Sequence, residues 1–195
     1  PEDPFTKITA ITVYLNWMDQ LVTLAIPPQS MTDDEAGTIA GRFDNTFMFR
    51  EETEMLNTFL DLIEDADVLS GWNSEGFDIP YIINRTTRVL SKDDTRRMCL
   101  WGQLPRMREY EKFGKTSQTY DTFGRVHMDY MQLYRKYTYE ERHSYSLDAI
   151  GEYELGERKT QYEGTLDQLY NKDFQTFIQY SRQDVALLDK RSEEH

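Results

Sequence analysis

Acidic residues at the ends of predicted elements are the side chains of this sequence best suited to catalytic chemistry. Asp78 follows a predicted buried strand and begins a predicted helix. Tyr180 and Asp184 lie four positions apart on the last predicted helix, so they share one face. Carboxylates that converge from separate elements can hold two divalent cations about 4 Å apart, on either side of a scissile phosphate. The pattern therefore suggests metal-assisted phosphodiester hydrolysis.

Plainer interpretations of the same residues remain open. Asp78 taken alone is typical of a helix N-cap, and a Tyr–Asp pair on a helix surface is common. Other catalytic chemistries have less support. Cys99 is the single cysteine, which leaves no internal disulfide or Cys-x-x-Cys metal site. The segment Gly114-Lys115-Thr116 lacks the first glycine of a phosphate-binding loop, and His127 and His143 have no recognisable nucleophile beside them.

Hydrophobic periodicity predicts the elements that position these residues. Strands are expected at Lys7–Leu15, at Leu21–Ile26 and around Phe47–Phe49, paired antiparallel, with a polar stretch over Ser30–Asp44. The clearest helix is Glu51–Asp65, with one apolar stripe. Further elements are a buried strand at Val68–Trp72, a hairpin over Lys112–His127, and helices at Ile79–Leu90, Asp129–Tyr137, Ser146–Tyr153 and Asp173–Lys190. The order predicts one mixed α/β domain over residues 1–195.

The formal net charge of −13 argues against nucleic-acid binding by the chain as a whole. The charge is uneven, however. Glu51–Pro80 contains nine acidic residues and no Lys or Arg, whereas Arg85–Lys115 contains nine basic and four acidic residues. An acidic metal pocket beside a surface that follows phosphates fits this pattern, and two solvated faces of opposite sign fit it as well. If the basic surface binds single-stranded DNA, we expect Arg96 and Arg97 to contribute.

Composition also limits where the protein acts. No run of about 18 apolar residues is present, so no membrane association is expected. The opening Pro1–Pro4 segment has neither a basic nor an apolar region typical of a signal peptide. A single cysteine is consistent with a reduced, cytoplasmic setting.

Two segments resemble motifs of the family-B DNA polymerases. Gly71–Tyr81 (GWNSEGFDIPY) resembles their second exonuclease motif, N-x-x-x-F-D, and Tyr180–Asp184 resembles the third, Y-x-x-x-D. The tyrosine of the third motif marks the DEDDy subclass of ribonuclease-H-like exonucleases. Lys159–Gly164 and Met128–Tyr137 resemble segments of T-even-like phage enzymes that accompany these motifs. The likeness covers nearly the whole chain in order.

This resemblance implies a fold and an activity. The fold would be a ribonuclease-H-like mixed sheet flanked by helices, with a β-hairpin insertion. The activity would be 3′→5′ proofreading, in which two Mg²⁺ or Mn²⁺ ions support hydrolysis that releases nucleoside monophosphates. The substrate would be single-stranded DNA or a primer 3′ end, presented by the rest of a polymerase in a phage-infected bacterium.

The resemblance also implies roles for individual residues. Asp78 would bind the second metal, and Asp184 the first. Tyr180 would orient the attacking water or the scissile phosphate, and Lys159 would offset negative charge near the metals. Asn73 and Phe77 would shape the pocket for the terminal nucleotides. We expect Asp78 and Asp184 to face one acidic pocket with Tyr180 at its rim.

One family motif has no counterpart here. The first exonuclease motif, D-x-E, supplies two carboxylates from a strand, and no Asp-x-Glu lies on a predicted strand. We therefore expect the chain to begin after this motif, to be nearly inactive alone, and to self-associate through exposed strand edges. The missing carboxylates and the acidic charge favour a second hypothesis, a non-catalytic nucleic-acid-binding or interaction module. A third, a stand-alone DEDDy ribonuclease, is disfavoured by the long hairpin between the motifs.

Overall fold

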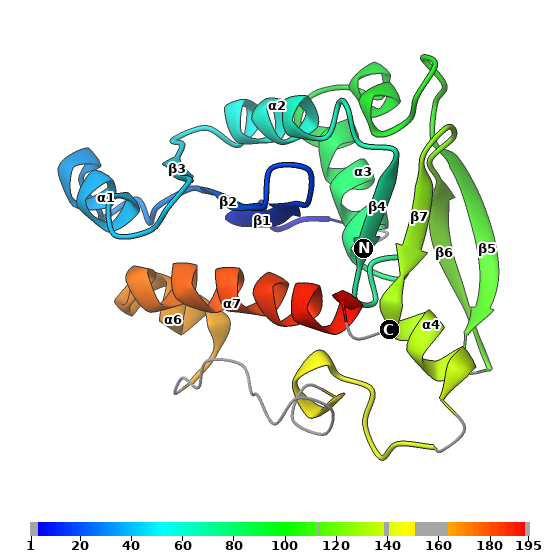
Figure 1. Ribbon diagram of the computed structural model, residues 1–195. Helices are drawn as coiled ribbons and strands as arrows, with labels where there is room; N and C mark the ends of the chain where they lie inside the picture. Colours follow the sequence, from blue (N-terminus) through cyan, green and yellow to red (C-terminus); the bar gives the residue numbers. More distant parts are fainter. Residues whose placement is uncertain (1–3, 113, 139–140, 151–163, 194–195) are drawn as a thin grey trace. The chain divides into compact units, whose positions relative to one another are not determined.

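The computed structural model describes residues 4–112, 114–138, 141–150 and 164–193, which divide into two compact units (Figure 1). The hairpin unit comprises Pro1–Lys7 and Leu56–Arg142, and the three-stranded unit comprises Ile8–Met55 and His143–His195. Within the described residues, no helix is both long and apolar enough to cross a bilayer. The single domain expected over residues 1–195 stays a prediction.

The three-stranded unit contains a small mixed sheet in the order β1-β2-β3. Its strands are β1 (Ala10–Leu15), β2 (Gln20–Ala25) and β3 (Thr46–Met48). β1 and β2 pair antiparallel, as predicted, with Thr12 opposite Thr23. β2 and β3 pair parallel, with Thr23 opposite Thr46, so the prediction of three antiparallel strands was wrong.

A helix within the polar stretch Ser30–Asp44 explains the parallel pairing. Helix α1 (Asp33–Ala40) lies between β2 and β3 and acts as a crossover, which returns the chain to the end where β2 began. A capping box begins it: the Glu35 N–H donates to Thr32 Oγ1 at 3.2 Å, and the Thr32 N–H donates to Glu35 Oε2 at 3.0 Å.

The long C-terminal helix supplies the core of the three-stranded unit. Helix α7 (Phe174–Glu193) confirms the helix predicted at Asp173–Lys190, and α6 (Leu166–Lys172) precedes it. Phe174 and Ile178 are buried with Ala25 of β2, and Tyr170 packs against the same cluster. Further along this helix, Val185 and Leu188 are only partly buried, whereas Leu187 is 3% exposed.

The hairpin unit is built around a parallel strand pair and an antiparallel hairpin. Its elements are β4 (Val68–Gly71), α3 (Asp78–Val89), the 3₁₀ helix η1 (Asp93–Met98), β5 (Arg106–Lys112), β6 (Lys115–Asp121), β7 (Val126–Asp129) and α4 (Tyr130–Tyr137). The predicted strand at Val68–Trp72 is present as β4, but the prediction that it is buried was wrong, because Val68 and Ser70 are exposed and Leu69 and Gly71 are only partly buried. The predicted helix at Ile79–Leu90 is confirmed. Helix α2 (Glu52–Leu62) confirms the helix predicted at Glu51–Asp65 and contains the boundary between the units.

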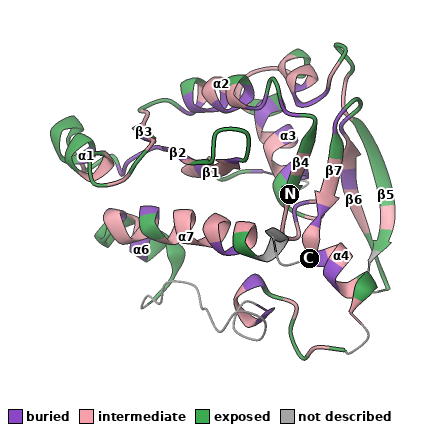
Figure 2. Ribbon diagram, in the orientation of Figure 1, coloured by how far each residue is buried: buried purple, intermediate pink, exposed green. Residues whose placement is uncertain are grey.

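The hairpin lies earlier in the chain than Lys112–His127, so that prediction was wrong. β5 pairs with β6 from Arg106↔Asp121 to Lys112↔Lys115, and the turn contains Gly114. Gly124 lies in the next connection, where an added Cβ would stand 2.5 Å from Leu100 Cβ. Figure 2 shows β5 exposed along most of its length.

Two further helices complete the comparison with the predicted elements. Helix α4 confirms the prediction at Asp129–Tyr137, with Asp129 as its N-cap. Residues 147–150 are helical, in agreement with the prediction at Ser146–Tyr153, whose last three residues lie outside the described part of the chain.

Candidate active site

The loop Asn73–Phe77 connects β4 to α3 and leads directly to Asp78. The loop closes on itself, because the Phe77 N–H donates to the Asn73 carbonyl at 3.1 Å and the Ile79 N–H donates to the Ser74 carbonyl at 2.9 Å. Asn73 has a φ of +58°, a left-handed conformation that Asn tolerates better than most residues. Gly71 permits the close return of the chain, since a Cβ there would lie 2.8 Å from Ser74 Cβ.

A buried carboxylate from another strand holds this loop. Asp129, the last residue of β7, is 6% exposed. Its Oδ1 accepts the Asn73 N–H at 2.9 Å, and its Oδ2 accepts the Glu75 N–H at 3.1 Å. Oδ1 also accepts the Met131 N–H at 3.0 Å, which caps α4. Hydrogen bonds to an ionised acceptor are stronger than neutral ones, so Asp129 joins the loop firmly to the start of α4.

Two side chains of the loop have partners on other strands. Ser74 Oγ lies 2.8 Å from His127 Nε2 on β7, and burial lowers the pKa of that imidazole. Arg108 on β5 donates from Nη2 to Glu75 Oε1 at 2.9 Å and from Nε to Asp121 Oδ1 at 3.0 Å. Hydrogen bonds to Asp121 and Glu75 raise the pKa of Arg108. These four charged or titratable groups line one pocket of about 370 Å³.

Asp78 occupies the first turn of α3, where the helix dipole favours negative charge. The N-cap position belongs to Phe77, so the interpretation of Asp78 as a simple N-cap was wrong. The Asp78 side chain is exposed. The Phe77 ring is half exposed and stacks on Tyr81, with a centroid distance of 5.5 Å and an interplanar angle of 25°.

Tyr180 and Asp184 stand on α7, one helical turn apart. The Oδ1 atom of Asp184 is buried, and the Tyr180 side chain is partly buried. Ser181, between them, lies with its Oγ 2.8 Å from Thr12 Oγ1 of β1. Leu187, three residues after Asp184, is buried. The Ser181 contact therefore ties the segment of α7 that carries the third motif to β1.

An arginine joins α7 to the sheet. Arg182 Nη1 donates to Thr23 Oγ1 at 3.1 Å and to Thr46 Oγ1 at 3.0 Å, so one guanidinium bridges β2 and β3. Burial lowers the pKa of Arg182, and the charge of Asp44 opposes that shift. Thr12 and Thr23 also lie within 3.0 Å of each other through their hydroxyl oxygens. Thr12, Thr23 and Thr46 form a row across the sheet, and their contacts with Ser181 and Arg182 determine which face of α7 is turned toward the sheet.

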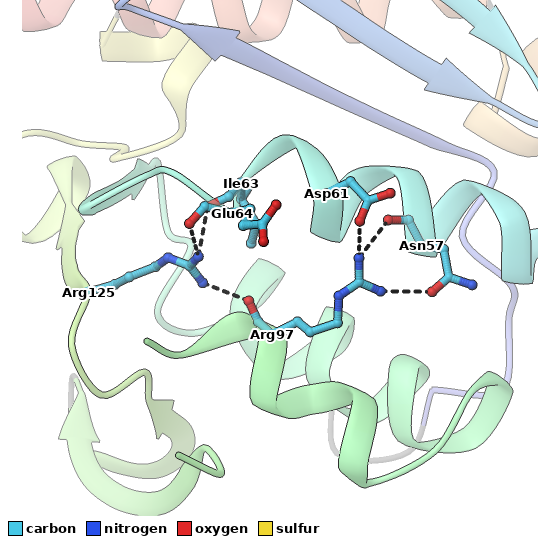
Figure 3. Close-up of polar contacts among 6 residues, drawn as sticks. All are labelled: Asn57, Asp61, Ile63, Glu64, Arg97 and Arg125. Carbon is cyan, nitrogen blue, oxygen red and sulfur yellow. Dashed lines mark hydrogen bonds and ion pairs between the residues drawn. The ribbon is translucent and has the colours of Figure 1, made fainter. Parts of the chain in front are cut away.

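The remaining predicted residues are placed as follows. Arg96 forms an exposed ion pair with Asp93 at 2.7 Å and donates to the Gly102 carbonyl at 2.8 Å. Arg97 donates to Asn57 Oδ1 at 2.8 Å and pairs with Asp61 (Figure 3). Both guanidinium groups therefore make contacts within the hairpin unit, and their role in nucleic-acid binding stays a prediction. Lys159 lies outside the described residues.

Sequence reasoning missed two structural side chains of the hairpin unit. Arg125 is 7% exposed and donates to the carbonyls of Ile63, Glu64 and Arg97 (Figure 3). It also donates to the carbonyls of Ala66 and Cys99, so it joins the end of α2 to η1. No sequence pattern marks that role. Asp129 did carry a signal, because an Asp at the very start of a predicted helix is typical of an N-cap. No sequence signal marks the contacts of Asp129 with the loop at Asn73.

The sequence predicts Asp78 and Asp184 as metal ligands. Asp78 and Asp184 belong to different units, and the described residues contain no group of three His, Cys, Asp or Glu side chains able to hold a metal. Mg²⁺ is commonly bound by one or two carboxylates together with water and substrate phosphates. Carboxylate oxygens suit Mg²⁺ or Mn²⁺ better than a softer metal, so each of these carboxylates taken by itself is compatible with such an ion, and the joint binding of ions by both stays a prediction.

Comparison with known proteins gives a consistent result. The model of the DNA polymerase family B exonuclease domain matches residues 3–150, which include the Asn73–Phe77 loop, Asp78 and Asp129. The chain is 32% identical over 139 residues to the DNA-directed DNA polymerase of Escherichia phage RB69, covering 70% of this chain and 15% of the relative. The corresponding enzyme of Enterobacteria phage T4 is 30% identical over 139 residues, with the same coverage. The DNA polymerase of Autographa californica nuclear polyhedrosis virus is 28% identical over 152 residues, covering 74% of this chain and 15% of the relative. The chain thus spans about 15% of the length of these curated relatives.

Proposed function

Because the chain belongs to the exonuclease-domain family of family-B DNA polymerases, we propose that it is a 3′→5′ proofreading exonuclease domain. The similarity to the phage RB69 and T4 polymerases supports a phage enzyme, acting in the cytoplasm of an infected bacterium. The partners we propose are the 3′ end of single-stranded DNA or of a primer and the remainder of a polymerase. Self-association of the isolated chain is a further expectation.

The observation that carries this proposal is the loop that presents Asp78. A glycine, a left-handed asparagine and a buried carboxylate together fix a closed turn whose end places Asp78 at the start of α3. The loop lies inside the part of the chain that matches the family. We propose that the chain has a ribonuclease-H-like fold. The parallel β4–β7 pair and the mixed β1-β2-β3 sheet support this proposal.

In the proposed reaction, water attacks the terminal phosphate. A bond forms from the water oxygen to phosphorus, the bond to the 3′ oxygen of the preceding nucleotide breaks, and that oxygen takes a proton. Two Mg²⁺ or Mn²⁺ ions, when bound, would activate the water and stabilise charge on the leaving oxygen. Asp78 and Asp184 would hold these ions, which requires their carboxyl carbons to approach within about 12 Å.

Other side chains would bind and orient the substrate. Tyr180, one turn from Asp184, would hydrogen-bond the water or the scissile phosphate. The exposed ring of Phe77 offers a surface for stacking of a terminal base, and Asn73 lies in the same loop. Lys159 would offset charge near the ions. Arg96 and Arg97 would follow the DNA backbone, and charge reversal at both should weaken binding of single-stranded DNA.

The test is digestion of a single-stranded oligonucleotide with Mn²⁺. None of the described strands carries Asp-x-Glu. All variants are therefore made in this chain with a strand carrying that motif added before Pro1, and this parent protein is called the extended chain. Asp78→Asn and Asp184→Asn should each lower the cleavage rate of this parent chain by more than about 100-fold. Loss of a residue that only hydrogen-bonds a metal ligand costs about 10–100-fold, and loss of the ligand itself should cost more. Asp34→Asn, an exposed carboxylate on α1, is the matched control and should cleave like the parent. Full activity in both site variants would refute the assignment.

The net charge of −13 favours a second candidate, a non-catalytic nucleic-acid-binding or interaction module. The two candidates differ in a simple observation. An extended chain that binds the oligonucleotide and leaves it intact at every Mg²⁺ and Mn²⁺ concentration is a binding module. Degradation that depends on Asp184 identifies an exonuclease.

A further inference from the structure

The position of Asp78 depends on hydrogen bonds made by the residues on either side of it. The Phe77 N–H is bound to the Asn73 carbonyl, and the Ile79 N–H is bound to the Ser74 carbonyl. The position of the Asp78 main chain therefore depends on the positions of the Asn73 and Ser74 main chains. Whatever fixes the start of the loop also fixes the first turn of α3.

Asp129 is the side chain that fixes the start of the loop. It lies opposite Gly71 in the β4–β7 register, at the end of both strands. Both of its oxygens are engaged by N–H donors, two from the loop and one from α4. With 6% of the residue exposed, these bonds form away from solvent, where a missing acceptor is most costly.

We infer that Asp129 is a positioning residue, which sets the location of Asp78 through the main chain of the Asn73–Phe77 loop. The inference rests on the proposed function, because the position of Asp78 matters only if its carboxylate binds a metal or substrate. Asp129 itself does not touch the reacting atoms, since its oxygens accept backbone N–H groups. It also differs from an ordinary helix cap, because the same carboxylate serves two chain segments more than 50 residues apart.

Two additional contacts make the loop part of a larger arrangement. His127 reaches the Ser74 hydroxyl from β7, two residues before Asp129. Arg108 reaches Glu75 from the hairpin strand β5 and is held in turn by Asp121 of β6. Loss of Arg108 should therefore disturb the loop less than loss of Asp129, because its partner is a side chain rather than the main chain.

The variant Asp129→Ser separates the two tasks of this carboxylate. Serine is a good N-cap, so the bond to the Met131 N–H and the start of α4 are retained. The serine hydroxyl is a single acceptor on a shorter side chain, so it cannot replace both bonds to the loop. Thr32→Ala is the matched control, because it removes the cap of α1 and costs stability without touching the loop.

The experiment measures Mn²⁺ binding by electron paramagnetic resonance and oligonucleotide cleavage over a range of Mn²⁺ concentrations, in the extended chain. In Asp129→Ser we expect the Mn²⁺ concentration for half-maximal binding to rise about 10–100-fold, with much of the cleavage rate recovered at saturating Mn²⁺. Hydrogen exchange at Asn73 and Glu75 should become faster. Thr32→Ala should leave the Mn²⁺ dependence unchanged at a temperature well below unfolding.

The outcomes separate the inference from the proposed function. If Asp78→Asn shifts the Mn²⁺ dependence and Asp129→Ser does not, the positioning role is wrong and the proposed function stands. If Asp78→Asn itself leaves Mn²⁺ binding and cleavage unchanged, the proposed function fails. If Asp129→Ser and Thr32→Ala shift the Mn²⁺ dependence equally, the effect is general destabilisation and the inference is overturned.

Discussion

Asp78 in the hairpin unit follows a loop held by a few polar contacts, whereas Tyr180 and Asp184 in the three-stranded unit stand on a helix of 20 residues. The loop depends on one carboxylate, Asp129, that accepts main-chain N–H groups. The helix is held by an apolar core and by hydroxyl and guanidinium contacts to three strands. A loop residue is thus sensitive to one polar partner, while a helix residue depends on packing spread along several turns.

The largest effect should come from the apolar core under α7. Ile178 is fully buried against Ala25 and Phe174. Ile178→Ala should lower the free energy of unfolding by about 4 kcal/mol, because it removes buried methyl groups and leaves a cavity. Urea denaturation measures the change, with Ile178→Val as the conservative control at about 1 kcal/mol. Equal costs for the two variants would show that packing does not hold this helix.

Removal of the carboxylate that holds the loop should have the next largest effect. Asp129→Ala leaves three main-chain N–H groups without their acceptor and should cost about 3 kcal/mol. Urea denaturation gives the cost, and hydrogen exchange at β7 should localise it to the hairpin unit. Asp34→Ala, on the exposed side of α1, should change stability by less than about 0.5 kcal/mol. A similarly small cost at Asp129 would remove the contrast between the two regions.

The polar contacts of α7 should matter less than those of the loop. Arg182→Met keeps most of the aliphatic side chain and loses the two hydrogen bonds to Thr23 and Thr46, at a cost of about 1 kcal/mol. Thermal unfolding of this variant beside Ile178→Ala gives the comparison directly. A cost for Arg182→Met as large as that for Ile178→Ala would mean that the guanidinium, rather than the core, orients α7.

The smallest effect should be the contribution of His127 to the pH dependence of the free energy of unfolding. Burial lowers the pKa of His127 below its ordinary value of 6.5, so the unfolded chain binds the proton more readily than the folded chain. This contribution is fully present above pH 6.5 and is lost as the pH falls through the lowered pKa. Denaturation at several pH values should show a shallower decline for His127→Asn than for the parent.

The parts of the fold that were predictable share a strong local pattern. Helices α2 and α7 have continuous apolar stripes, and the end of β4 followed by α3 correctly placed Asp78 at the start of a helix. Helix α1 was missed because its only buried residue is Ala36, and its clearest signal was the pair Thr32 and Glu35. The wrong prediction of antiparallel pairing for β3 followed from that omission.

The contacts that hold the candidate site were not predictable from local patterns. Asp129 binds the N–H groups of Asn73 and Glu75, which precede it by 56 and 54 residues. Arg182 reaches Thr23 across 159 residues. Periodicity describes which face of an element is apolar and carries no record of which distant main-chain group a buried charge will meet.

The position of Cys99 gives the hairpin unit a built-in reporter. It is the single cysteine of the chain, lies at the end of η1 with 5% exposed, and its carbonyl accepts Arg125 Nη1 at 3.4 Å. Burial also raises the pKa of the thiol, which lowers its fraction of reactive thiolate. An alkylating reagent can therefore reach this sulfur only during transient opening of the segment. With no second thiol to compete, the alkylation rate measures how often the region around Arg125 opens in the native protein.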